Sequence, residues 1–172
     1  MIEGKAEALP ADIGSFDVVT IGRALHWMDR DATLALFERL VAAKGVVVVC
    51  SSHSAADGRN PWLDEYNKAR RSWSEESLWS ESGSGARAHR DLAAFFRGTR
   101  FHVADLIKDE SSHEISVSDL ARRVLTFSSS SPEVLGDRAG AMLRDVEQRL
   151  LPLSRDRVVT EVFTSTAQVA RR

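Results

Sequence analysis

The residues with the clearest chemical potential stand together after one short apolar segment. His26 and Trp27 follow the run Ser15–Ile21, and Gly22 directly ends that run. An imidazole can act as a general base, and a glycine lets a ligand approach the main chain closely. If residues 15–21 form a strand, all three residues follow its carboxyl end, where open α/β sheets bind their ligands. The spacing therefore predicts a small-molecule site at this end of the strand.

Other kinds of site find no support in the residue pattern. The remaining histidines are His53, His89, His102 and His113. They have no metal-ligand spacing with one another or with the single cysteine, so no metal is implied. No serine lies in a G-x-S-x-G elbow, which argues against a hydrolase.

Composition narrows the class of protein further. The 172 residues, 43% of them hydrophobic, suffice for one compact domain. A formal charge of -2 gives no broad attraction for nucleic acid or an acidic membrane, and a small molecule is the expected partner. Cys50 ends an apolar run and is expected to be a buried thiol. No run is long enough to span a bilayer and no signal peptide is evident, so a cytoplasmic location is expected.

Three predicted elements would position the candidate site. Residues 15–21 form a short buried strand, residues 31–43 an amphipathic helix, and residues 45–50 a second buried strand. Asp29 or Asp31 would cap the helix, and the glycine at position 45 would follow its end. Strand, helix and strand in this order predict a right-handed βαβ unit.

The rest of the chain is predicted to alternate between helices and strands. A helix at 63–73 precedes a loop, and a capping box at Ser116–Asp119 opens another helix. The tryptophans at 62, 73 and 79 either form a lid or pocket wall, or pack the loop onto the core. The further elements are a short helix at 88–96, a strand at 101–107 with an extension toward 115, a helix at 131–150 and a long closing strand at 158–170. We expect a single partial domain over residues 1–172, with a helical and loop insertion at about 53–98.

Three motifs near the N-terminus, in order, resemble class I S-adenosylmethionine-dependent methyltransferases of the small-molecule type. They are Gly4-Lys5-Ala6-Glu7-Ala8-Leu9-Pro10, then Ser15-Phe16-Asp17-Val18-Val19-Thr20, then Ala24-Leu25-His26-Trp27. In that family the first ends the third strand, the second forms the fourth strand, and the third opens the loop behind it. The resemblance implies an α/β, Rossmann-like sheet that lacks its first strands and ends in an antiparallel strand. That last strand would lie between the strands at 45–50 and 101–107.

The same resemblance implies a cofactor site. Lys5, Ala6 and Glu7 would border the adenine of S-adenosylmethionine, while Ile21 and Gly22 would approach its methionine part. Lys5 stands where the family usually has an acidic residue, and an ammonium group cannot accept a hydrogen bond from the adenine amino group. The sequence has no strand ending in a D-x-G-x-G loop and no acidic residue after it for the ribose. We therefore expect the chain to begin after that loop and to bind the cofactor weakly by itself.

His26 and Trp27 would line the pocket of a small-molecule methyl acceptor. His26 could serve as a base, or it could only orient the loop. The second interpretation is preferred, because methyl transfer to a nucleophilic acceptor can proceed through proximity and alignment alone.

Two other functions stay open at this stage. The chain could be a non-catalytic fragment that acts as an interaction module or has no role, or an NAD-binding α/β enzyme. In the family the strand at 16–21 pairs on its outer side with a first strand that this sequence does not contain. That edge is expected to be unpaired, and to recruit a second copy or a separate chain.

Overall fold

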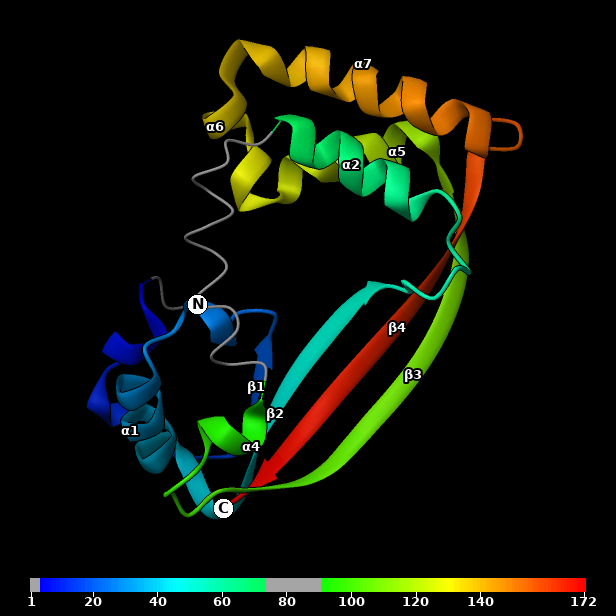
Figure 1. The fold of residues 1–172 in the computed structure, drawn as a ribbon. Coiled ribbons are helices and arrows are strands. Elements are labelled where there is room, and N and C mark those ends of the chain that lie inside the picture. The colour runs from blue at the N-terminus through cyan, green and yellow to red at the C-terminus, as the bar shows by residue number, and fades with distance from the viewer. Residues whose placement is uncertain (1–3, 74–90) are drawn as a thin grey trace. The chain divides into compact units, whose positions relative to one another are not determined.

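The computed structural model describes residues 4–73 and 91–172. Four described strands form one sheet in the order β1-β2-β4-β3 (Figure 1). They are β1 (Phe16–Gly22), β2 (Val41–Ser54), β3 (His102–Ser116) and β4 (Val158–Arg171). The last strand thus lies inside the sheet, between the second and the third, as the sequence predicts.

Strand directions also agree with the prediction. β1 and β2 are parallel, with Gly22 opposite Cys50. β4 runs against β2, because successive contacts advance along β2 while they retreat along β4 (Figure 1). These contacts are Arg172 N to Gly45 O at 3.2 Å, Ser52 Oγ to Ser165 Oγ at 3.0 Å, and Ala55 N to Val162 O at 2.8 Å. The predicted α/β sheet with an antiparallel C-terminal strand is confirmed.

The described residues gather into two compact units. The first comprises residues 4–52, 91–109 and 165–172, and the second comprises residues 53–73 and 110–164. The single partial domain, with its insertion at about 53–98, is not tested by this division and stays a prediction. No helix among the described residues is long and apolar enough to cross a bilayer.

In the first unit, helices cover one side of the sheet. α1 (Arg30–Leu40) and α4 (Leu92–Phe95) place Phe37, Phe95 and Phe96 against Ile21 and Val47. Strand side chains alternate between faces, so Val18 points away from these helices and is 56% exposed. The core of this unit therefore lies on a single face of β1 and β2.

The junction between α1 and β2 is tighter than predicted. Asp29 caps α1 by accepting a hydrogen bond from Ala32 N at 2.9 Å. The helix ends at Leu40 rather than residue 43, because the β-branched Val41 is extended and buried. Gly45 lies within β2 and therefore does not terminate the helix. A Cβ at this position would lie 3.0 Å from the carbonyl oxygens of Phe16 and Asp17 in β1. Its role is to let the two strands approach each other closely.

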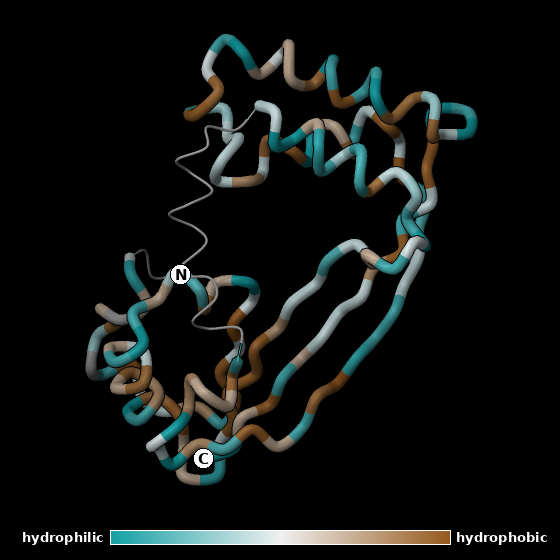
Figure 2. Tube along the Cα trace, in the orientation of Figure 1, coloured by the Kyte–Doolittle hydropathy of each residue, from teal (hydrophilic) through white to brown (hydrophobic). Residues whose placement is uncertain are grey.

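The second unit packs helices around its own apolar core. It contains α2 (Leu63–Trp73), α5 (Val117–Arg123), α6 (Pro132–Leu135) and α7 (Ala139–Leu150). α2 has the predicted bounds, and Ser116 caps α5 as expected. The helix predicted at 131–150 is interrupted, because Gly136 adopts a φ of 53° after α6. Figure 2 shows apolar residues alternating with polar ones along α7, whose buried residues include Met142 and Val146.

Two of the tryptophans pack this unit onto its core. Trp62 is 1% exposed and donates to Thr160 O at 2.9 Å, and Trp73 donates to Asp145 Oδ2 at 2.8 Å. For these two, the core-packing interpretation is correct and the lid interpretation is wrong. Trp79 and the predicted loop after α2 lie outside the described residues.

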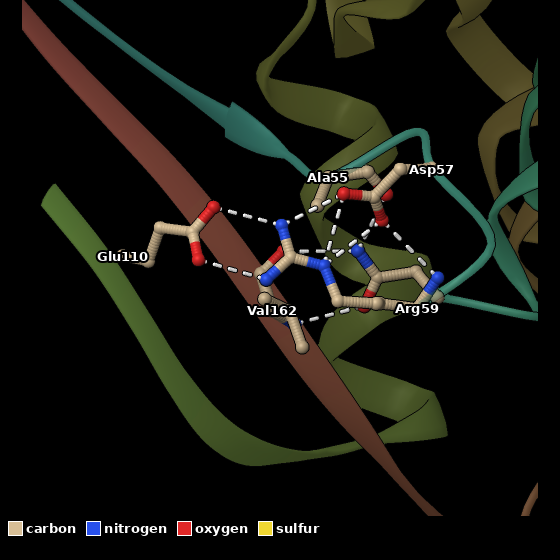
Figure 3. A network of polar contacts seen from close by, with 6 residues as sticks. Ala55, Asp57, Arg59, Glu110 and Val162 are labelled. Atoms are coloured by element: carbon tan, nitrogen blue, oxygen red, sulfur yellow. Dashed lines mark hydrogen bonds and ion pairs between the residues drawn. The ribbon is translucent and has the colours of Figure 1, made fainter. Parts of the chain in front are cut away.

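A polar network fixes the segment between β2 and α2 (Figure 3). Arg59 donates to both carboxylate oxygens of Glu110, at 2.9 and 2.8 Å, and its Nε donates to Asp57. Hydrogen bonding to Glu110, and then to Asp57, raises the pKa of Arg59, and the bonds from Arg59 lower the pKa of Asp57. Asn60 is buried and exchanges hydrogen bonds with Val162 at 2.9 and 2.8 Å, which ties the segment to β4.

A fully buried carboxylate lies in the same unit. Glu161 on β4 accepts two hydrogen bonds from Arg123, at 2.6 and 2.8 Å, and one from Ser54 Oγ at 2.6 Å. The bonds to Glu161 raise the pKa of Arg123. Removal of Arg123 would leave the fully buried carboxylate of Glu161 without its arginine partner, which is strongly destabilising.

Burial raises the pKa of Tyr66 to about 12. Its hydroxyl has no hydrogen-bond partner among the described residues. Tyr66 is also the only tyrosine in the sequence, so an absorbance titration of tyrosinate reports on this residue alone. We expect the tyrosinate titration of Tyr66 to have its midpoint near pH 12 in the folded protein and near pH 10 in urea.

Because the unfolded state loses this proton first, the stability contributed by neutral Tyr66 is complete below pH 10 and is lost as the pH rises to about 12. The loss is roughly 1.4 kcal/mol per pH unit at most. In Tyr66→Phe, this part of the pH dependence should vanish, and the free energy of unfolding should rise by about 1 kcal/mol because an unpaired buried hydroxyl is removed. A folded-state midpoint near 10 would contradict the burial of the ring.

Candidate functional site

Two adjoining hollows lie at the carboxyl end of β1 and beside residues 49–52 of β2, shortly before β2 ends. Their volumes are about 390 and 450 Å³, within the range of small-molecule sites. Both are lined by Arg23, Cys50, Ser51 and Thr166. β4 takes part because its antiparallel course brings Thr166 beside the end of β2. The sheet topology therefore gathers residues of all four described strands around the two hollows.

Side-chain alternation assigns each hollow to one face of the sheet. The smaller hollow has Val49 and Leu92 in its wall, and both belong to the helix-covered side. The larger hollow has Gly22, Ala167 and Ile107 in its wall and lies on the opposite side. We call them the covered hollow and the open hollow.

The turn after β1 is built with backbone strain. Arg23 has a φ of 54°, which is uncommon for a residue other than glycine. Its N–H donates to Cys50 O at 3.1 Å, which holds the turn against the end of β2. A short 3-10 turn, η3 (Leu25–Trp27), follows and buries Leu25 in the core. This turn places His26 in the wall of the covered hollow.

The structure brings some of the predicted site residues to the hollows. Gly22 lines the open hollow and His26 lines the covered one. Ile21 lines neither hollow and is buried in the core. Trp27 is 63% exposed and lines neither hollow, although its ring centre lies 4.8 Å from that of His26.

The segment predicted to border the adenine lies elsewhere on the surface. Lys5 and Ala6 are exposed and are absent from the walls of both hollows. Glu7 belongs to the 3-10 turn η1 (Ala6–Ala8). The roles of these three residues stay predictions.

Sequence reasoning missed several residues of the site. Cys50 was expected to be buried, but it is half-buried and lines both hollows, because it lies opposite Gly22, the last residue of β1. The rule that ligands bind at strand ends would have found Cys50 and Ser51. No local signal marks Thr166 and Gln168, which reach the site only through the insertion of β4. Among the described residues, no group of histidine, cysteine and acidic side chains could hold a metal.

The N-terminal part of the chain matches a known family. Residues 1–49 match the methyltransferase domain family, and this segment contains β1, α1 and most of the apolar part of β2. The resemblance to class I methyltransferases is confirmed. No curated protein sequence matches the chain.

One solved methyltransferase structure shares the fold of this chain, and a second is reported beside it. A provisionally named type II methyltransferase from Anaeromyxobacter dehalogenans is 18% identical, with a TM-score of 0.58 over 98% of this chain and 68% of its own. A provisionally named methyltransferase from Bacillus halodurans C-125 is 16% identical, with a TM-score of 0.45 over 98% of this chain and 69% of its own. At these identities the first likeness establishes the methyltransferase-like fold, and the chain spans about two thirds of that neighbour's length.

Proposed function

We propose that this chain carries part of the site of an S-adenosylmethionine-dependent methyltransferase that acts on a small molecule. One observation carries the proposal: the two hollows lie at the carboxyl end of β1, a strand within the segment that matches the methyltransferase domain family. Ligands of open α/β sheets bind at such strand ends. The resemblance and the geometry thus point to the same place.

The residues present fit one end of the cofactor. Gly22 has nothing within 4 Å of the position of an added Cβ, so a ligand can approach its main chain from the open hollow. Ile21 and Gly22 are proposed to contact the methionine part, and Lys5, Ala6 and Glu7 the adenine. The 172 residues contain no D-x-G-x-G motif followed by an acidic residue for the ribose. We therefore expect weak binding of S-adenosylmethionine to this chain.

The described side chains would position an acceptor. S-adenosylmethionine, when bound, supplies a methyl group on a positively charged sulfur. Leu25, Val49 and Leu92 form an apolar wall in the covered hollow that excludes water from one side of an acceptor. His26 and Gln168 can orient its polar groups by hydrogen bonds, and His26 can take up a proton if the acceptor must lose one. Trp27 is proposed to close over the acceptor.

Protection of the single cysteine tests cofactor binding without an activity assay. Cys50 lines both hollows, so a ligand there should slow its alkylation by a maleimide. We expect millimolar S-adenosylmethionine to slow the reaction several-fold, and ATP, which lacks the methionine part, to have no effect. Gly22→Leu should abolish this protection, because its side chain would occupy the open hollow without a clash.

Calorimetric titration of the same chain measures its affinity for S-adenosylmethionine directly. A dissociation constant in the low micromolar range would show that the residues present suffice, and the expectation of weak binding would be wrong. Equal alkylation rates with and without S-adenosylmethionine would favour the non-catalytic interpretation.

A second candidate function, an interaction module, rests on the edge strand β1. In the described sheet β1 pairs only with β2, and Phe16 and Val18 are 44% and 56% exposed. An apolar strand with a free edge can pair with another chain. We propose that a second copy of the chain, or a separate chain, binds along β1.

Sedimentation equilibrium tests this interface. Val18 is the appropriate position, because Val19 packs against the core and a lysine there would disturb folding. We expect the wild type to form dimers and Val18→Lys to weaken them at least tenfold, about 1.4 kcal/mol. Val103→Lys, on the edge strand β3, should leave association unchanged. A wild type that stays monomeric at high concentration would refute the interface.

A further inference from the structure

The strained turn after β1 directs a cation to the candidate site. Arg23 lines both hollows and adopts a φ of 54°, although Gly22 beside it could take this conformation at lower cost. Strained backbone at a residue other than glycine persists where the surrounding structure enforces it, and such positions cluster at functional sites. Here the hydrogen bond from Arg23 N to Cys50 O enforces it.

The guanidinium group of Arg23 has no ion-pair or hydrogen-bond partner among the described residues. Other arginines of the same unit are engaged: Arg30 binds carbonyl groups of Phe95 and Arg97, and Arg172 binds Glu38. An arginine that lines a hollow without a carboxylate partner keeps its donors available for a ligand.

The wall of the covered hollow suits a negatively charged ligand. Among the described residues that line it, none is an aspartate or glutamate. Its donors besides Arg23 are His26, Ser51, Thr166 and Gln168, and its apolar part comprises Ala24, Leu25, Val49 and Leu92. A molecule with one anionic end and an apolar body would match both parts. The volume of about 390 Å³ limits that molecule to a small one.

We infer that Arg23 binds the carboxylate of a small, largely apolar carboxylic acid in the covered hollow, and that this acid is the methyl acceptor. The carboxylate site itself does not depend on the proposed function. Only the identification of the acid as the methyl acceptor rests on it. The guanidinium fork matches the two oxygens of a carboxylate. A phosphate is disfavoured because Arg23 is the only arginine or lysine among the wall residues that the structure describes.

Fluorine NMR with two matched probes tests the inference. The probes are para-trifluoromethylbenzoate and its uncharged analogue para-trifluoromethylbenzamide. We expect the benzoate to bind the wild-type chain about tenfold more tightly than the benzamide, since one charge-assisted contact is lost. Arg23→Gln should remove this preference. Arg97→Gln is the matched control, because Arg97 is exposed in the same unit and lines neither hollow.

Arg23→Gly separates binding from folding. Glycine relieves the strained backbone, so this variant should fold at least as well as the wild type and still lose the preference for the benzoate. Equal binding of the two probes to the wild type, or a preference retained in Arg23→Gly, would overturn the inference.

A second pair of ligands distinguishes the acceptor from the cofactor as the source of the carboxylate. S-adenosylhomocysteine carries an amino-acid carboxylate, and methylthioadenosine lacks it. If Arg23→Gln weakens S-adenosylhomocysteine alone and leaves the benzoate unaffected, the carboxylate belongs to the cofactor and the acceptor assignment is wrong. If the wild type binds the benzoate through Arg23 but Cys50 is not protected by S-adenosylmethionine, the carboxylate site stands and the proposed function fails.

Discussion

The pairing of β4 with β2 is the interaction on which the rest of this structure depends. β4 is the last strand in the sequence, yet it lies between β2 and β3, so its main-chain groups must satisfy two neighbours at once. The first half of β4 contains Glu161, which binds Arg123. Its Thr160 and Val162 carbonyls accept hydrogen bonds from Trp62 and Asn60. Its second half brings Thr166 and Gln168 to the hollows and Ala170 into the core. Disruption of this one strand would therefore disturb the core contacts and the candidate site together.

Buried polar groups make the position of β4 specific. Glu161 is fully buried and needs Arg123 and Ser54 as partners, while the buried Asn60 needs Val162. Because a strand shifted by one residue turns every side chain to the other face, a slipped β4 would leave these groups without partners. Such penalties select one register even where apolar contacts alone would tolerate another.

Much of the fold could be predicted from the sequence, because its strands and helices carry strong local signals. Three segments illustrate this. The valine-rich run of β2 indicates a strand, and the capping box at Ser116 and the apolar spacing in α2 each indicate a helix. The errors arose where a tertiary contact decides the conformation. Gly45 has the composition of a helix end but serves a close approach to β1, and Gly136 divides a helix whose apolar spacing continues past it.

The candidate site was predictable only in part, for a related reason. Gly22 and His26 follow a strand, so a rule about strand ends finds them. Arg23 adopts its strained conformation through a hydrogen bond to Cys50, which no local pattern reveals. Thr166 and Gln168 are far away in the sequence and reach the site by strand pairing alone. Site residues that come together only through the pairing of distant strands can be identified only from the structure.

We expect ligands to bind at the carboxyl end of β1, beside residues 49–52 of β2 and residues 165–168 of β4. Two-dimensional amide NMR of the isotope-labelled chain, titrated with S-adenosylmethionine, tests it most directly. The account predicts that shift changes concentrate at residues 22–26, 50–52 and 165–168, which line the two hollows. Changes confined to residues 117–150, with none at the strand ends, would contradict it.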